Sequence, residues 1–352
     1  MKIALLFDGA SALGADPDVM ILGTIEAIEA VLAAEGNQVV RVPAHTDGRW
    51  IERLRRMKAD LVFNLCEGID GIAALEASAI SAVEAVGVPF TGSSSWTASL
   101  CLRKHVVNAL LDRAGLPIPR FAVVRRDAPL PSVGFPAIVK PAAEDASIGV
   151  EQRSVVRSAR ALAERVEAMH TRWDELIVQR YVDGREVNVG ILGDQVLPVS
   201  EIHFDALPKG MWRIVSYRAK WDVGSEEDIG TTPVCPADLP KALTADLERI
   251  ARTAWRIVGG EGYGRVDFRI DRKGRPWLLE VNANPDIAPD AGLARMARVA
   301  GMDYGALVLA VCELALARSR VPDEDRWALA ERLSGIVAQD ATALELFAVG
   351  QR

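Results

Sequence analysis

Two polar side chains lie close together where an apolar segment ends near residue 280. Glu280 and Asn282 are two positions apart in LLEVNANPD, residues 278–286. Side chains two residues apart on a β-strand point to the same face, so one carboxylate and one amide oxygen project together. Such oxygen donors can bind a hard cation. The alternative is a polar strand end that begins a loop, because Asn-Pro commonly starts one.

The residues just before this segment favour the cation site. GYGRVDFRIDRKGRPW, residues 262–277, predicts two strands joined by a turn at residues 271–274, with Arg265 and Asp267 on one face of the first strand. Pairing of the strands places Asp267 beside Glu280 and Asn282. The set then predicts a Mg2+ site with positions open for nucleotide phosphates. Arg265 can neutralise transferring phosphoryl oxygens or a developing oxyanion.

A second group of residues is suited to binding phosphates. Lys140 ends the apolar segment PAIVK, and the loop EDASIGV after it contains Ser147 and Gly149, small residues that let backbone N–H groups approach a phosphate. Lys104 begins a predicted helix and would supply a second ammonium group. Each lysine taken singly is equally well explained as a solvated surface charge. No G-x-x-x-x-G-K-[ST] motif is present, so a P-loop is excluded.

The segment VQRYVDGREVNV, residues 178–189, offers a site for a flat base. Groups from Gln179 to Val182 can form hydrogen bonds to the base in a hinge between two lobes, and Glu186 can accept from ribose hydroxyls. The alternative is a simple strand, turn and strand with Glu186 at an exposed edge.

The elements that must position these residues fall into three regions and a tail. Residues 1–101 show a βαβ rhythm, with strand-like segments at residues 2–7, 37–42, 60–65 and 88–92, which predicts an open parallel sheet. Residues 102–185 predict a small α+β lobe with a helix over 159–169. Residues 186–320 predict a second α+β lobe with a helix over 239–258, closed by a helix over 304–319. Residues 321–352 predict an amphipathic helical tail.

Composition bounds the class of protein. The chain has 352 residues, half of them hydrophobic, which suits two or three globular domains. A net charge of -7 without a Lys/Arg block argues against a nucleic-acid partner. No long apolar run predicts a membrane span, and the apolar run at the N-terminus is too short for a signal peptide. Four scattered cysteines without a CxxC pair fit reduced thiols, so we expect a cytoplasmic protein.

Taken in order, these elements resemble the ATP-grasp superfamily and, within it, the D-alanine–D-alanine ligase family. The resemblance spans about residues 2–319 and is carried by CLRK, RAGLPIPRF, IVKPAAEDASIGV, VQRYVDGREVNVGIL, SYRAKW, GRVDFRID and LLEVNANPD. It implies a three-domain ATP-grasp fold of α/β and α+β class: an N-terminal open parallel sheet, a small central lobe and a C-terminal lobe. ATP would lie between the last two domains.

The resemblance also implies roles for individual residues. ATP would be bound by Lys104, Lys140, Ser147, Gln179, Tyr181, Val182, Glu186 and Lys220. Here Gln179 stands where the family has an acid that reads the adenine amino group. Asp267, Glu280 and Asn282 would bind Mg2+, with Mn2+ as a substitute. Arg265, Ser147 and Lys220 would act in catalysis: a carboxylate attacks the γ-phosphorus of ATP, and an amine then attacks the acyl phosphate to give an amide, ADP and phosphate.

The substrate pocket departs from the family pattern. The family's first loop carries an acid that binds the amino group of the first substrate, whereas FDGASALGADPDV has no matching Glu. Ala146 stands in place of a serine, Trp221 of the lid tyrosine, Asp286 of a glycine and Ala291 of a serine that holds the acceptor carboxylate. These departures predict a product other than D-alanyl-D-alanine.

Three more residues are candidates for this altered pocket. Glu67, in NLCEG at the end of a strand, can replace the missing amine-binding acid, or can instead be an N-cap of the next helix. Arg269 and Arg295 can bind a carboxylate or another anion, or can be surface residues.

Our first hypothesis is therefore a ligase that joins small amino-acid or peptide substrates, with homodimerisation implied by the resemblance. The alternatives are a non-catalytic nucleotide-binding scaffold and a ligase for a peptide or protein acceptor.

Overall fold

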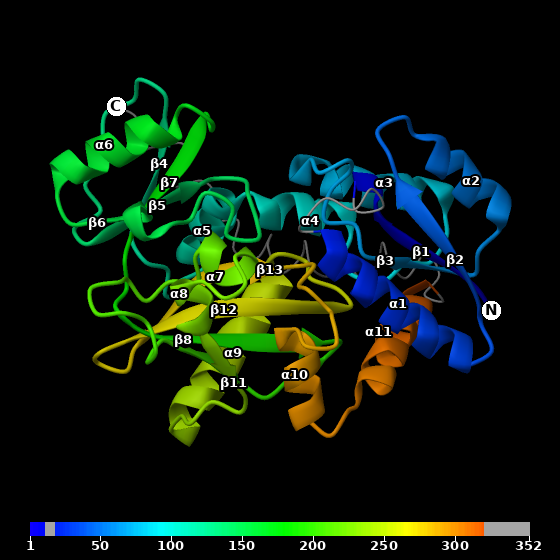
Figure 1. The fold of residues 1–352 in the computed structure, drawn as a ribbon. Helices are drawn as coiled ribbons and strands as arrows, with labels where there is room; N and C mark the ends of the chain where they lie inside the picture. The colour runs from blue at the N-terminus through cyan, green and yellow to red at the C-terminus, as the bar shows by residue number, and fades with distance from the viewer. Residues whose placement is uncertain (11–17, 320–352) are drawn as a thin grey trace, which may run out of the picture.

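The computed structural model describes residues 1–10 and 18–319, arranged around three sheets (Figure 1). The N-terminal sheet is parallel and has the order β2-β1-β3, with β1 (Lys2–Asp8) in the middle, β2 (Gln38–Ala44) and β3 (Leu61–Asn64). The parallel sheet predicted from the βαβ rhythm is confirmed. The strand predicted over residues 88–92 is wrong, because only a single parallel bridge between Val62 and Phe90 forms there.

Helices flank this sheet and lead into the central lobe. They are α1 (Asp18–Ala34), α2 (Arg49–Met57), the 3-10 turn η2 (Ala73–Leu75), α3 (Glu76–Val86), α4 (Ser95–Leu102) and α5 (Lys104–Arg113). The helix predicted before Gly115 thus begins at Lys104 and ends as Gly115 takes a positive φ of 78°, a conformation that favours glycine.

The central lobe has an antiparallel sheet in the order β4-β7-β5-β6, covered on one face by α6. Its elements are β4 (Phe121–Arg125), β5 (Ala137–Pro141), η3 (Gln152–Ser154), β6 (Val155–Val156), α6 (Ala159–Met169) and β7 (Glu175–Arg180). Val139 and Val178 pack in the core shared with α6. Side chains alternate along a strand, so Lys140 and Gln179 project from the opposite face.

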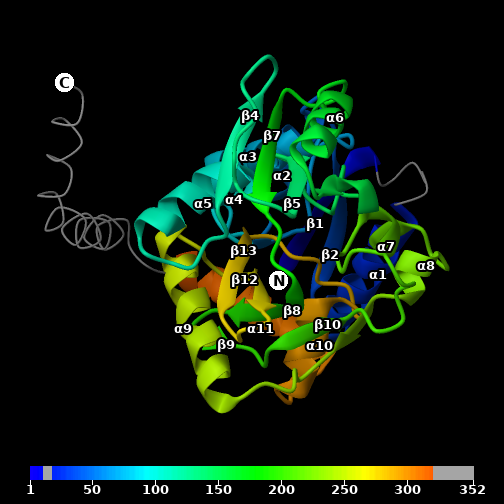
Figure 2. The same cartoon turned by 90° about the vertical axis from the view of Figure 1, so that its left-hand side faces the viewer.

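The C-terminal lobe has a sheet in the order β11-β10-β8-β12-β13, with β9 beside β8. Its elements are β8 (Gly184–Leu192), β9 (Gln195–Val196), β10 (Ser200–His203), α7 (Tyr217–Trp221), α8 (Glu226–Ile229), β11 (Thr232–Val234), α9 (Lys241–Ile257), β12 (Tyr263–Asp271), β13 (Pro276–Asn282) and α10 (Gly292–Val299). Val266 and Phe268 pack on the same core as α9, so the alternate residues of β12 lie on the other face. The central lobe stands above that face in Figure 2.

The last described helix, α11 (Tyr304–Ser319), packs against the C-terminal lobe, where it was predicted, and also against the N-terminal sheet. Leu307 and Val311 belong to one core with Leu293 of α10 and with Leu5 and Ile28 of the N-terminal region. The predicted tail over residues 321–352 lies outside the described residues. Within the described residues, no single helix is long and apolar enough to cross a membrane; α10 and α11 meet that test only as a pair, bent by 103°.

Candidate active site

The predicted hairpin forms and brings the proposed cation ligands together. In the register of β12 and β13, Asp267 pairs with Glu280 and Arg265 pairs with Asn282. A bulge follows Asp267, and the turn closes with a bond from Gly274 N to Asp271 O of 2.9 Å. Two carboxylates and one amide therefore lie on adjacent strands, as the two-residue spacing predicts.

Two neighbouring side chains donate hydrogen bonds to the carboxylate of Asp267. Arg265 donates from Nε to one carboxylate oxygen at 2.7 Å and from its terminal nitrogen to the other at 2.9 Å. Asn188, on the adjacent β8, donates to Asp267 at 2.7 Å. Asp267 raises the pKa of Arg265 although burial opposes this, so the guanidinium stays positive beside the cation ligands.

Lys104 joins the central lobe to the same hairpin. Its Nζ donates to Asp145 Oδ1 at 2.5 Å and to Glu280 Oε1, and only 7% of its side chain is exposed. Burial acts against the charge of Glu280, but Lys104 and Lys140 outweigh it and lower its pKa to about 2. Asp145 was not among the residues predicted from sequence. Its only signal is its place in the loop EDASIGV, next to the predicted phosphate site.

Two further lysines converge on this centre. Desolvation lowers the pKa of Lys140 and of Lys220, and the charge of Arg265 also acts on Lys220. The negative charge of Glu280 opposes this by raising the pKa of both lysines. Three lysines and one arginine therefore lie near Glu280 and Asp267, and such ammonium and guanidinium groups suit phosphate oxygens.

The loop after β5 is clamped to the segment that carries Lys220. Ser147 donates from Oγ to Val215 O at 2.8 Å, and Trp221 donates from Nε1 to Ala146 O at 3.0 Å. Ala146 and Ser147 both have positive φ, 53° and 61°, a conformation that is uncommon for residues other than glycine. The loop and α7 thus form one cover, and Trp221 acts here through its ring nitrogen.

The predicted base site lies in the hinge between the lobes. Gln179 is 1% exposed, and its Nε2 has no hydrogen-bond partner among the described residues. Tyr181 packs edge-on against Trp212 with ring centroids 5.1 Å apart. Val182 follows directly. An unpartnered buried amide in this position fits a bound base, because buried donors in proteins are almost always paired.

Arg269 lies beside this hinge as well. It forms an ion pair with Glu186 at 2.8 Å and lies 5.6 Å from the Tyr181 ring centroid. Burial raises the pKa of Glu186, while Arg269 opposes that rise. The structure therefore places Arg269 beside the predicted ribose acid and does not bring it to Glu67. Arg295 is also apart: it lies on α10 and donates to Asp290 O at 2.7 Å.

A small pocket lies at the other end of the hairpin, between α1, the end of β3 and the loop after β13. Its lining combines two acids with apolar and amide groups: Ile21, Thr24, Leu65, Glu67, Tyr263, Asn284, Pro285, Asp286 and Ile287. Desolvation and the negative charge of Asp286 raise the pKa of Glu67 to about 7. The N-cap interpretation of Glu67 is wrong, because the next helices begin after Ile72 and Leu75.

Asn284 ties this pocket to the cation ligands, a role that sequence reasoning missed. Its Nδ2 donates to Cys66 O at 3.0 Å and to Glu76 Oε1 at 3.1 Å, and its backbone N–H donates to Asn282 Oδ1 at 2.9 Å. Burial raises the pKa of Glu76 to about 8, so its carboxyl group is largely neutral at pH 7. These hydrogen bonds fix the N-terminal domain against the hairpin. Ala291, at the N-cap of α10, supplies no side-chain cap.

The residues present fit a nucleotide and a hard cation. Buried ammonium groups, an unpartnered amide and paired carboxylates supply what phosphates, a base and Mg2+ need. Within the described residues, no three His, Cys, Asp or Glu side chains are grouped to hold a metal. Asp267, Glu280 and Asn282 alone supply too few oxygen ligands for Mg2+. Phosphate oxygens of a nucleotide would supply more of them.

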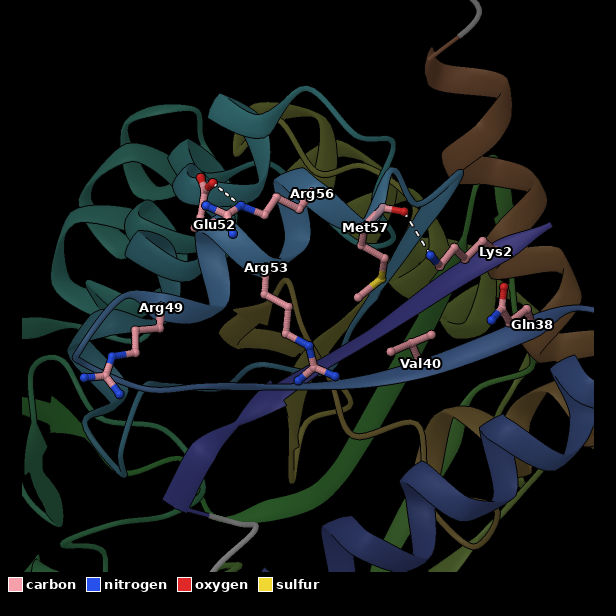
Figure 3. A pocket seen from close by; sticks show the side chains of 8 residues that line it. All are labelled: Lys2, Gln38, Val40, Arg49, Glu52, Arg53, Arg56 and Met57. Carbon is pink, nitrogen blue, oxygen red and sulfur yellow. Dashed lines mark hydrogen bonds and ion pairs between the residues drawn. The ribbon is translucent and has the colours of Figure 1, made fainter.

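A larger groove on the surface is unrelated to this chemistry. It lies between α2 and the edge strand β2, elements that supply none of the residues described above (Figure 3). Half of its lining residues are basic: the full lining is Lys2, Gln38, Val40, Arg49, Glu52, Arg53, Arg56 and Met57.

Comparisons with known proteins show which family the chain resembles. The family model described as D-ala D-ala ligase C-terminus matches residues 110–313. The chain is 33% identical over 322 residues to a D-alanine--D-alanine ligase of Dechloromonas aromatica, covering 89% of this chain and 97% of the relative. It is 32% identical over 335 residues to one of Bordetella parapertussis, covering 91% and 97%.

A solved structure shares the fold. A D-alanine--D-alanine ligase from Bacillus anthracis, described as complexed with ATP, matches with a TM-score of 0.74 and 20% identity, covering 91% of this chain and 99% of that one.

Proposed function

The chain belongs to the D-alanine–D-alanine ligase family of ATP-grasp enzymes, which form carbon–nitrogen bonds, and from this we propose that it joins two D-alanine molecules with conversion of ATP to ADP and phosphate. The observation that carries the proposal is that one hairpin serves both groups of residues. Lys104 bonds Glu280 on β13, and the pocket of Glu67 and Asp286 lies beside the end of the same strand. A carboxylate held in that pocket would face the phosphate end of the nucleotide site.

The residues of this chain would position and stabilise the reaction. Lys104, Lys140 and Lys220 would hold the phosphates while a substrate carboxylate oxygen attacks the γ-phosphorus and ADP leaves. The amine nitrogen of the second substrate then attacks the acyl carbon, loses a proton, and phosphate departs to leave the amide. Arg265 would stabilise the oxyanion of the tetrahedral intermediate. Asp267, Glu280 and Asn282 would hold Mg2+, which neutralises phosphate charge when bound.

The choice of product reverses the expectation drawn from the pocket. The departures at Ala146, Trp221, Asp286 and Ala291 favour a different product, whereas relatives at 32% and 33% identity are D-alanine--D-alanine ligases over nearly their full length. We give the relatives more weight, because Glu67 offers an acid for the substrate ammonium even though the first loop has none. The scaffold hypothesis is set aside, because the family is one of enzymes.

The test is product formation by the purified protein. With Mg2+, ATP and D-alanine, we expect phosphate release together with D-alanyl-D-alanine, identified by mass and by comparison with a standard. A panel of other amino acids and dipeptides runs in parallel. ADP formation without any dipeptide, under conditions where ATP binds, would contradict the proposal.

A second candidate is a ligase with a different acceptor, including a peptide. Asp286 favours it: this side chain faces the pocket where the family has a glycine, and it accepts from Ala288 N at 2.8 Å. Turnover with D-alanine only as the first substrate, and with another amine as the second, would select this candidate. The roles given to residues 1–101, 102–185 and 186–320 as domains, and homodimerisation, stay predictions.

A further inference from the structure

The side chain of Asn282, a proposed cation ligand, is oriented by its neighbour Asn284. The backbone N–H of Asn284 donates to Asn282 Oδ1 at 2.9 Å. An amide oxygen has two lone pairs, so this bond leaves one of them for a cation. The bond limits rotation of the Asn282 amide, and it does so only as firmly as Asn284 is itself held in place.

The side chain of Asn284 is bonded at both of its polar atoms. Nδ2 donates to Cys66 O at 3.0 Å and to Glu76 Oε1 at 3.1 Å, which uses both of its hydrogens. Oδ1 accepts from the hydroxyl of Tyr263 at 3.2 Å. These partners define which atom of the amide is oxygen, because the opposite assignment would place an oxygen against the carbonyl of Cys66.

The anchors of this side chain come from two domains. Cys66 follows β3 and Glu76 begins α3, so both belong to the N-terminal domain, whereas Tyr263 begins β12 of the hairpin. All three residues are buried. Groups packed in a protein interior have few alternative positions. The loop after β13 is therefore held by both domains at the residue that orients Asn282.

We propose that Asn284 is a positioning residue for the cation, although it does not bind the cation itself. Its backbone N–H holds the Asn282 amide with one oxygen lone pair available, and its side chain makes that orientation depend on the N-terminal domain. Hydrogen-bond partners of metal ligands typically change metal affinity by about 10- to 100-fold when they are lost. The inference rests on the cation site of the proposed function and deepens it.

Binding of Mn2+ in the presence of a non-hydrolysable ATP analogue tests the inference without turnover. Electron paramagnetic resonance measures free Mn2+ and so gives its affinity. We expect Asn284→Ala to weaken Mn2+ binding about tenfold and to leave binding of the metal-free analogue unchanged. The matched control is Asn37→Ala, which removes another asparagine that donates to a backbone carbonyl, Leu32 O at 3.0 Å. This variant should bind Mn2+ like the unmodified protein.

Substitutions at Glu76 make the test independent of the folding of Asn284→Ala. Burial raises the pKa of Glu76 to about 8, so at pH 7 a neutral amide resembles its carboxyl group. Glu76→Gln keeps an acceptor for Asn284 Nδ2 and should retain the Mn2+ affinity. Glu76→Leu removes the acceptor and should weaken Mn2+ binding. Thermal melting shows whether each variant is folded, and equal Mn2+ affinities of the two folded variants would contradict the role of this anchor.

A double-mutant cycle tests whether Asn284 acts through Asn282. In an Asn282→Ala background, Asn284→Ala should add little to the loss of Mn2+ affinity, because the ligand that it positions is gone. Additive losses, or an Mn2+ affinity that Asn284→Ala does not change, overturn the inference and leave the proposed function standing. The expected Mn2+ affinities in a protein that forms no dipeptide contradict the proposed function alone. Absence of Mn2+ binding to the unmodified protein overturns both.

Discussion

The two ends of the proposed active site are built in different ways. At the nucleotide end, the charged groups form ion pairs with one another: Arg265 with Asp267, Arg269 with Glu186, and Lys104 with Glu280. At the substrate end, Glu67 and Asp286 face a pocket, and each acts on the other with the same sign of charge. The first end is organised before a ligand arrives, whereas at the second end burial and Asp286 outweigh the charges of Lys220 and Arg265 and keep the pKa of Glu67 raised.

This difference predicts where substitutions act. A change at the nucleotide end removes a member of a connected ionic network and should reduce turnover for every substrate. A change at the substrate end should alter the affinity for one substrate and its pH dependence, and leave ATP binding intact.

The largest expected effect belongs to Glu280→Ala. This substitution removes one of the two paired carboxylates and leaves Lys104 with only Asp145, so we expect kcat to fall by about 10²–10³ or more. Phosphate release under saturating D-alanine measures it. Asp246→Asn, an exposed carboxylate of α9 that pairs with Arg249, is the matched control and should retain full activity. Comparable losses in both variants would show that the effect is not specific to the cleft.

An intermediate effect is expected for Glu67→Gln. The pKa of Glu67 is raised to about 7, so its carboxyl group is largely neutral below that pH and binds an ammonium group poorly. The kcat/KM for D-alanine should therefore rise with pH through about 7 and flatten above it. Glu67→Gln should remove this rise, and at pH 8 should lower kcat/KM by about 10- to 100-fold, as for a lost charged hydrogen bond. The KM for ATP should not change.

Asp286→Asn tests whether Asp286 sets the pH dependence assigned to Glu67. Removing the negative charge of Asp286 takes away one cause of the raised pKa, so the rise in kcat/KM should move to lower pH. A rise that stays at the same pH in this variant would assign it to another group.

The smallest effect is expected at the cover that spans the two lobes. Trp221→Phe removes the bond from Nε1 to Ala146 O and should raise the KM for ATP about two- to tenfold, the range for one neutral hydrogen bond. Tyr217→Phe, on the same short helix, leaves the backbone bond to Val150 O in place and is the control. Equal KM values for Trp221→Phe and the unmodified protein would mean that this bond does not stabilise the closed cover.

The nucleotide end could be predicted from sequence because its geometry is local. A hairpin of two adjacent strands fixes Asp267 opposite Glu280, and the period of two fixes which residues share a face. The roles expected of Lys140 and Gln179 came from the resemblance to the family, and the strand register then places both side chains on one face. What this reasoning missed there, Asp145, sits in an irregular loop where no period applies.

The substrate end depends on contacts between distant segments, which periodicity does not give. Asn284 meets Cys66 and Glu76 across more than 200 positions of the chain. The contact of α11 with the N-terminal sheet was missed for the same reason: its apolar residues predict that the helix is covered, without showing which elements cover it. Residues 11–17, which carry part of the predicted departure from the family, lie outside the described residues.

The central claim is that a substrate carboxylate takes the γ-phosphoryl group of ATP in this cleft. The most direct measurement follows oxygen from D-alanine labelled with ¹⁸O in its carboxylate. If the carboxylate attacks phosphorus and the amine then displaces phosphate, each released phosphate carries one labelled oxygen and ADP is the nucleotide product. Unlabelled phosphate beside a dipeptide, or release of AMP and pyrophosphate, would contradict the account.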